Sequence, residues 1–143
     1  LQRQSTRIRR MTAIYLCYGK ISLTEDRLKG RHNMAILAMA VPILPGKKEK
    51  WWKEVIENFT VTNKAETDAL REEAGVHERT FLQETPNGDF VILTFEGEDP
   101  AAAWAHIMQN MPPEMADIVA DIHGFDMDAP PPPLPKLVYD SRA

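Results

Sequence analysis

The sequence predicts an α+β fold in which an antiparallel sheet carries helices on one of its faces. Three observations support this prediction: an apolar run near residue 35, two β-rich runs around a tight turn at 86–89, and helical apolar spacing in the flanking segments. The 143 residues suffice for one domain, and 43% apolar with 27% charged residues is typical of a globular protein. No apolar run approaches the roughly 18 residues of a membrane span, and we expect a cytoplasmic protein without membrane contact.

The basic residues are concentrated at the start of the chain. Residues 1–33 contain eight Lys or Arg and two acidic residues, a net charge of +6, whereas residues 34–143 carry a net charge of −10. An Arg-rich, acid-poor segment is typical of a transit peptide, and an arm for nucleic acid or phospholipid is another interpretation. We favour a basic extension at 1–33 that is not part of the native domain, with the domain itself at 34–143.

The composition argues against several classes of site. The single cysteine, Cys17, excludes an internal disulfide and a cysteine-based zinc site. The four histidines are scattered without metal-ligand spacing, and no glycine-rich phosphate loop or Ser/His/Asp set is present. The net charge of −4 argues against a nucleic-acid partner. We therefore expect neither a metal nor a cofactor.

The first predicted element is a strand over Ala35–Leu44, which is apolar on both alternating faces. We expect Pro42 and then the Pro45-Gly46 turn to end its pairing. A helix follows from about Lys47, with one apolar stripe that Trp52 and Ile56 widen. The stripe is formed by Trp51, Val55 and Phe59.

Lysines crowd the start of this helix, where the positive end of the helix dipole disfavours them. They are Lys47, Lys48, Lys50 and Lys53. They mark either an anion-facing end or, as we favour, a solvated surface. A second helical piece is expected over Lys64–Ala74, ended by Gly75.

The clearest local signal is a β-hairpin over Val76–Glu96. Asn-Gly is a strong hairpin signal because both residues tolerate positive φ. A two-residue Asn87-Gly88 loop would place Leu82 opposite Leu93 and Arg79 opposite Glu96, the latter an opposite-charge pair across the strands.

Two helices and an extended arm complete the chain. Asp99-Pro100 is an N-cap followed by proline in the first turn. A second helix is expected over Glu114–His123, where Gly124 stops it. The prolines at 130–133 then predict polyproline II structure, and Leu137-Val138-Tyr139 offers a short last strand.

In chain order these elements form a βαββαβ pattern, the ferredoxin-like split unit. Its helices cover one face of the sheet, so Phe81, Phe90 and Ile92 would leave a large apolar patch on the other. The simplest cover is a second copy of the chain, sheet against sheet. The sequence therefore predicts a homodimer.

Two stretches of the domain resemble a known family. They are the run from Arg71 to Pro100 and the ending that contains Ile122-His123-Gly124-Phe125-Asp126, the prolines and Leu137-Val138-Tyr139-Asp140. The resemblance, over about Met34 to Asp140, is to small bacterial proteins of unassigned function that are similar to the dimeric α/β-barrel superfamily. That superfamily includes cofactor-free quinol monooxygenases, haem-degrading monooxygenases and stress-response barrel proteins. The resemblance implies a dimeric α/β barrel and transfers no catalytic residue.

His123 is the first candidate for a ligand-binding residue. It lies at a helix end, where the dipole favours a charged histidine, and Asp121 and Asp126 are near enough in sequence to orient it. His77 with Arg79 is the second candidate, because both would lie on the face that lines the dimer and could bind a carboxylate or phenolate. A purely structural role is the competing interpretation for each.

An apolar cleft between sheet and helices would supply the rest of a binding site. Its expected lining residues are Trp51, Trp104 and Met108, which would otherwise belong to the core. Two functions follow from the sequence. One is a dimer that binds a small, mostly apolar or aromatic molecule, with a cofactor-free monooxygenase or isomerase as its enzymatic form. The other is a non-enzymatic interaction module that uses the proline-rich arm.

Overall fold

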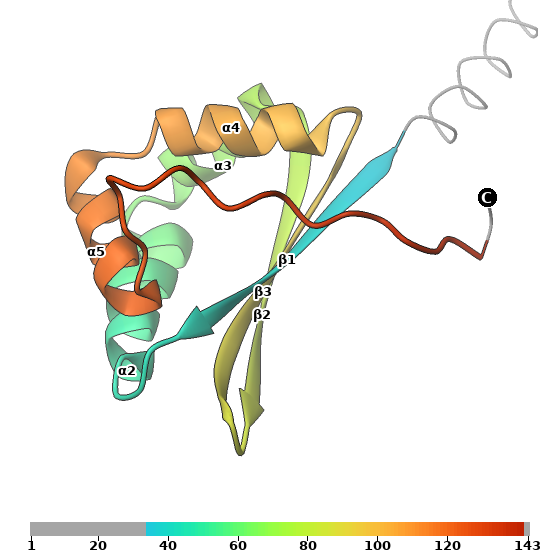
Figure 1. Cartoon of the computed structure of the whole chain (residues 1–143). Helices are drawn as coiled ribbons and strands as arrows, with labels where there is room; N and C mark the ends of the chain where they lie inside the picture. Colours follow the sequence, from blue (N-terminus) through green and yellow to red (C-terminus); the bar gives the residue numbers. More distant parts are fainter. Residues whose placement is uncertain (1–33, 142–143) are drawn as a thin grey trace, which may run out of the picture. The chain divides into compact units, whose positions relative to one another are not determined.

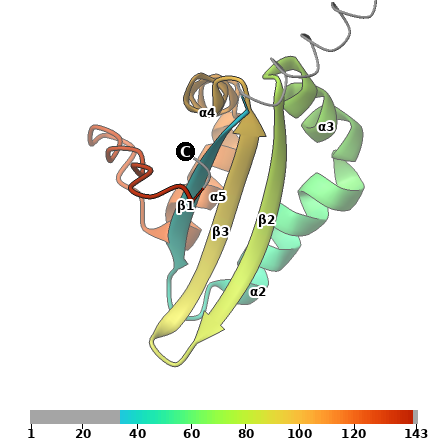
Figure 2. The same ribbon diagram turned by 90° about the vertical axis from the view of Figure 1, so that its right-hand side faces the viewer.

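The computed structural model describes residues 34–141, and every prediction for residues 1–33, Cys17 included, lies outside this range. The compact unit begins at Ala35 and contains a three-stranded antiparallel sheet. Helices cover one face of the sheet and leave the other open (Figures 1 and 2). The predicted α+β class is therefore confirmed. No helix within the described range has the length and hydropathy needed to span a membrane.

The three strands are β1 (Ala35–Ile43), β2 (Val76–Thr85) and β3 (Gly88–Gly97), arranged in the order β1-β3-β2. This matches three strands of the expected pattern. The fourth is missing, because residues 137–139 form no strand pairing in the described structure. The prolines at 130–133 and Pro135 lack N–H donors, and they carry the chain across β1 instead of along it (Figure 1).

The expectation that Pro42 ends the pairing of β1 is wrong. Pro42 is the Cα partner of Phe90, and β1 continues to Ile43. The carbonyl of Pro42 accepts a 2.7 Å hydrogen bond from His123 Nδ1, on the side away from β3. The missing N–H of Pro42 therefore points to the outer edge of the sheet, where proline is tolerated.

The hairpin lies where the sequence predicts it, but its predicted register is wrong. Leu82 is paired with Val91 rather than Leu93, and Thr85 is paired with Gly88. The turn is Pro86-Asn87, and within the hairpin only Gly88 has a positive φ, of 128°. In the expected register Pro86 would close the loop, but it has no N–H to donate across the strands. The shift is by two residues, so each side chain stays on its predicted face.

Four helical segments lie between β1 and β2. They are α2 (Lys48–Trp51), the π-helical η1 (Trp52–Ile56) and η2 (Asn58–Thr62), and α3 (Lys64–Glu73). Asn63 separates η2 from α3. Trp51 and Val55 are buried as the apolar stripe predicts, whereas Trp52 is half exposed. In η2 the N–H of Asn63 donates to the carbonyl of Asn58 at 2.8 Å, a five-residue spacing that widens the helix.

The last two helices are α4 (Pro100–Gln109) and α5 (Pro113–His123). Their ends confirm the sequence signals. The Asp99 carboxylate accepts a 3.0 Å hydrogen bond from the N–H of Ala102, which caps α4. Gly124 ends α5 with a φ of 71°, a conformation that favours glycine.

The core lies between the sheet and the helices and has two parts. The side chain of Ile122 is fully buried, and Phe95 is nearly so. Each such side chain contributes about 1.5–3 kcal/mol by leaving water. One part of the core comprises Ile43, Trp51, Val55, Val91, Met115 and Ile122. The other comprises Leu37, Met39, Phe95 and Ile107.

The opposite side of the sheet, here called the open face, carries the alternate residues of each strand. Ile36 is 62% exposed and Phe81 is 51% exposed. Figure 2 looks onto this face, with β3 between β1 and β2. Its rows across the sheet are Ile36–Glu96–His77, Ala38–Thr94–Arg79, Ala40–Ile92–Phe81 and Pro42–Phe90–Gln83.

Replacing Gly97 by alanine is expected to destabilise the fold by about 1–3 kcal/mol. A Cβ atom there would lie 2.5 Å from the Gly75 carbonyl oxygen and 2.8 Å from Val76 Cγ1, so the turn before β2 would have to shift. Urea unfolding measures the effect. Glu98→Ala, one residue later and exposed, is the control. Equal midpoints for the two variants would contradict the close packing at Gly97.

Candidate functional site

A groove of about 570 Å³ lies between the η2–α3 segment and β2, on the helix side of the sheet. Its apolar lining comes from Ile56, Phe59 and Val76. Three threonines add hydroxyl groups, and five charged side chains border the rest. The lining also contains Thr60, Thr67, Thr80, Lys64, Asp68, Arg71, Glu72, Glu78 and one residue that the sequence predicted for a site, His77.

Arg71 and Glu78 form the best-defined polar feature of this groove. Arg71 Nε donates to Glu78 Oε2 at 2.6 Å, and the two side chains are only 15% and 13% exposed. Thr80 Oγ1 donates to the other carboxylate oxygen, Oε1, at 3.1 Å. The guanidinium of Arg71 also lies 5.2 Å from the centre of the Phe59 ring, within cation–π range. Both ends of the ion pair are therefore held in place.

The tight turn between α3 and β2 creates this pair. Gly75, with a φ of 71°, reverses the chain directly after α3. The last turn of the helix and the first residues of the strand then lie side by side, although Arg71 and Glu78 are seven positions apart. The sequence analysis missed both residues. Two features of the sequence could have indicated this pair. Arg71 comes shortly before Gly75, which ends the helix, and Glu78 lies on the helix-facing side of the next strand.

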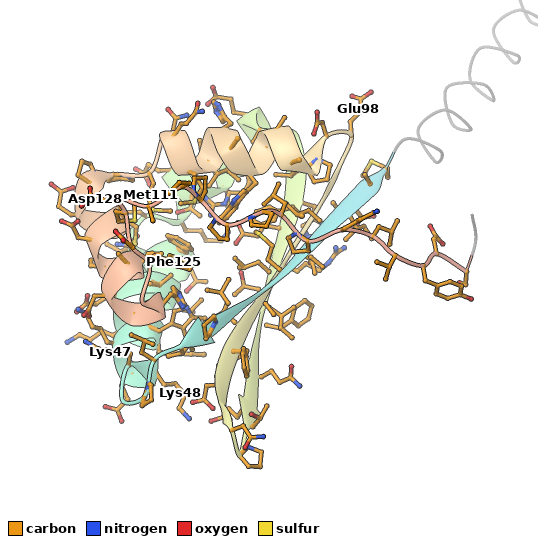
Figure 3. All side chains as sticks on the ribbon, in the orientation of Figure 1. Lys47, Lys48, Glu98, Met111, Phe125 and Asp128 are labelled. Atoms are coloured by element: carbon orange, nitrogen blue, oxygen red, sulfur yellow. The ribbon has the colours of Figure 1, made fainter. Side chains whose placement is uncertain are left out.

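The lysines at the start of α2 bind the protein's own carboxylates. Lys47 and Lys50 both contact Asp121 of α5 at 2.8 Å, and Lys48 pairs with Glu84 and Asp89 of the hairpin. Figure 3 shows Lys47 and Lys48 at the turn between β1 and α2. Hydrogen bonds from Lys47 and then Lys50 lower the pKa of Asp121 to about 2. The lysines at this helix end therefore face carboxylates of the protein itself, Asp121, Glu84 and Asp89.

His123 connects α5 to β1 and is nearly buried, with 9% of its surface exposed. Its Nδ1–H donates to the Pro42 carbonyl at 2.7 Å, and its ring lies 5.6 Å from that of Phe125. Burial lowers the pKa of His123 below its ordinary value, and the hydrogen bond to Pro42 offsets part of this effect. The histidine is thus held neutral by burial, not charged by the helix dipole.

The two carboxylates expected to orient His123 do not do so. Asp121 is engaged by Lys47 and Lys50, and Asp126 accepts a hydrogen bond from the N–H of Asp128 at 3.0 Å. The contacts of His123 connect two elements of the fold, and no groove residue is among them.

The other predicted site residues are dispersed. His77 and Arg79 lie on the open face, where Arg79 Nη1 pairs with Glu96 Oε2 at 3.0 Å. This pair is diagonal, because the residue directly opposite Glu96 is His77. Trp51 is a core residue with 3% exposure, and Trp104 packs against Phe95 with ring centres 5.4 Å apart. Met108, like Trp51 and Trp104, does not line the groove.

The groove offers binding chemistry rather than a recognisable catalytic set. A ligand would meet an apolar wall, hydroxyl groups and the Glu78 carboxylate, whose charge Arg71 balances. Within residues 34–141 no three His, Cys, Asp or Glu side chains are grouped as a metal site requires. The arrangement suits a flat, largely apolar molecule that carries a hydrogen-bond donor.

Comparisons of the chain with protein-family models, with curated proteins and with solved structures found no match.

The free energy of unfolding is expected to depend on the protonation of His123. Since the folded pKa lies below the ordinary 6.5, the unfolded chain binds the proton more readily, and the stability from neutral His123 is complete only above pH 6.5. It is lost as the pH falls through 6.5 towards the lowered pKa. Urea unfolding at several pH values measures this loss. His123→Gln keeps an N–H donor without titrating, so an identical pH slope in that variant would contradict the assignment.

Proposed function

We propose that the protein is a homodimer, formed sheet against sheet, in which each subunit binds a small, mostly apolar or aromatic molecule. The groove between the η2–α3 segment and β2 is the binding site. The observation that carries the proposal is the combination, in one groove, of an apolar wall with a fixed carboxylate and guanidinium.

The groove favours a phenol or quinol over a charged ligand. Its cations are already engaged, Arg71 by Glu78 and Lys64 by Asp68. An incoming carboxylate would compete with these internal carboxylates for the charge of Arg71 and Lys64, and an amine would compete with Arg71 for Glu78. A neutral ring could pack on Ile56 and Phe59 and donate its O–H to the carboxylate without breaking the pair.

The open face supports the dimer. Phe81 and Ile36 are more than half exposed, and Phe81 belongs to the apolar row Ala40–Ile92–Phe81 in the middle of the sheet. The Arg79–Glu96 ion pair separates this row from Ile36. An apolar row on the open side of a sheet is costly in water and typical of an interface. A second sheet packed on it, about 10 Å away, would remove these side chains from solvent.

The finer parts of the proposal rest on the sequence. The ferredoxin-like pattern, the dimeric α/β barrel and the bacterial, cytoplasmic setting come from the order of elements and from the family resemblance. A cofactor-free monooxygenase or isomerase reaction has the same basis. The geometry of the groove supports binding of a ligand but not a particular reaction. The reaction is tested by measuring turnover of a quinol that binds.

A quinol is expected to raise the melting temperature of the full chain, whereas flavin and haem serve as competing probes in the same thermal-shift screen. Glu78→Gln should weaken quinol binding at least tenfold, about 1.4 kcal/mol, because the charged acceptor is lost. Glu73→Gln, on the exposed side of α3 and outside the groove, is the matched control. A quinol that binds both variants equally, or that does not bind the unmodified chain, would refute this site.

Replacing Ile92 by lysine is expected to convert the dimer to monomers or aggregates, since it puts a charge at the centre of the open face. Light scattering coupled to size exclusion measures the mass. Val61→Lys adds the same charge at a position that is 75% exposed and outside the sheet, so it should leave the dimer intact. A dimer that tolerates Ile92→Lys would show that the open face is not the interface.

A further inference from the structure

Within residues 34–141, part of the outer edge of β1 has backbone groups without a backbone partner. In an antiparallel pair, the N–H and C=O of each residue point to the same side, and the side alternates along the strand. Pro42 and Leu44 point outward, because the Pro42 carbonyl accepts from His123 and the Leu44 N–H donates to the Ile122 carbonyl at 2.9 Å. By the same alternation Ile36, Ala38 and Ala40 point outward as well. The end of α5 thus covers one end of this edge, and no other described element pairs with the rest.

From Ala35 to Val41 this edge also lacks the charged side chains and prolines that usually protect an edge strand. The other edge strand, β2, carries His77, Glu78, Arg79 and Glu84. Charged side chains of this kind discourage pairing with a foreign strand. In contrast, β1 is AILAMAVPI and has no charged residue between Ala35 and Ile43. An apolar edge of this composition, with no strand paired to it among residues 34–141, is one to which another strand can add.

The chain itself provides a segment with complementary properties. Leu137, Val138 and Tyr139 are 72%, 88% and 78% exposed. Val and Tyr favour β-strands in which their side chains are at least half buried, so this exposure is unusual. The preceding prolines, 130–133 and Pro135, cannot donate backbone hydrogen bonds, so regular pairing can begin only at Lys136. The segment 136–140 is long enough to span from Ile36 to Ala40.

The position of this arm indicates which copy of β1 it reaches. From the end of α5, the arm crosses the outer edge of β1 and ends on the side of the sheet away from the helices (Figure 1). The view onto the open face agrees, since the end of the arm lies in front of β1 (Figure 2). That is the side on which the second sheet of the proposed dimer would pack.

We propose that residues 136–140 of each subunit add to β1 of the partner subunit as a fourth strand, beside Ile36, Ala38 and Ala40. The exchange would complete a four-stranded sheet in each half of the dimer. Leu137 and Tyr139 would lie on one face of that sheet and Val138 on the other. This inference rests on the homodimer of the proposed function and adds to it the contact that joins the two copies at their edges.

Hydrogen exchange of the full-length chain tests the strand pairing. The amides of Ile36, Ala38 and Ala40 are expected to be protected. A Leu137→Pro/Val138→Pro variant should speed their exchange at least tenfold. The N–H groups of adjacent strand residues point to opposite sides, so one of these two must donate to β1, and proline has no N–H. The Leu137→Thr/Val138→Thr variant keeps both donors and β-propensity, and should retain the protection. Unprotected amides in the unmodified chain, or unchanged exchange in the proline variant, would overturn the proposal.

Isotope-filtered nuclear Overhauser measurements on mixed labelled and unlabelled chains identify the donor of the strand. Contacts between 136–140 and β1 are expected only between chains, and contacts within one chain would overturn the exchange. The molecular mass separates this failure from that of the dimer. A dimer without these contacts refutes the arm exchange alone, whereas a monomer refutes the dimer and the exchange together.

Discussion

The position of β3 between two other strands constrains the rest of the structure. On its helix-facing side, Phe95 and Val91 are buried to 1% and 3% exposure, and they connect the two parts of the core. On its other side, Phe90 and Ile92 continue the open face. Because a strand alternates its side chains, no rotation or shift of β3 could bury both sets beneath one layer of helices. One layer of helices covers one side of this strand, and in the proposed dimer a second sheet covers the other side.

The remaining elements are held in place relative to that central strand. The α5 helix is joined to β1 by two hydrogen bonds, from His123 to Pro42 and from Leu44 to Ile122. The start of α2 is joined to α5 by Lys47 and Lys50 through Asp121. These lysines oppose the helix dipole, and an acidic partner from another helix offsets that cost. The exposed setting of these ion pairs makes their contribution small and sensitive to salt.

Local chemistry made much of the fold predictable from sequence. Asp99 with Pro100, and Gly124, mark helix ends through groups a few residues apart, and the β-rich runs around 86–89 identify two strands. The exact register depended on the absent N–H of Pro86, a detail that outweighed the preference of Asn-Gly for a two-residue loop. The expected last strand at 137–139 is absent from the described structure, because a short apolar run does not by itself supply the sheet edge with which a strand must pair.

The candidate site was less accessible to sequence analysis than the fold. Hydrophobic spacing correctly placed Trp51 on the inner side of its helix, but it could not separate a core position from a binding position. The Arg71–Glu78 pair depends on the turn at Gly75, and its burial follows from the packing of η2 and α3 against β2. Arrangements of this kind are set by tertiary structure and have no short motif.

The mass of the unmodified chain in solution tests the central claim most directly. Sedimentation equilibrium over a range of micromolar concentrations should give twice the mass of one chain, because the apolar half of β3 is then covered by a second sheet. A stable, non-aggregating species with the mass of a single chain throughout that range would contradict the account.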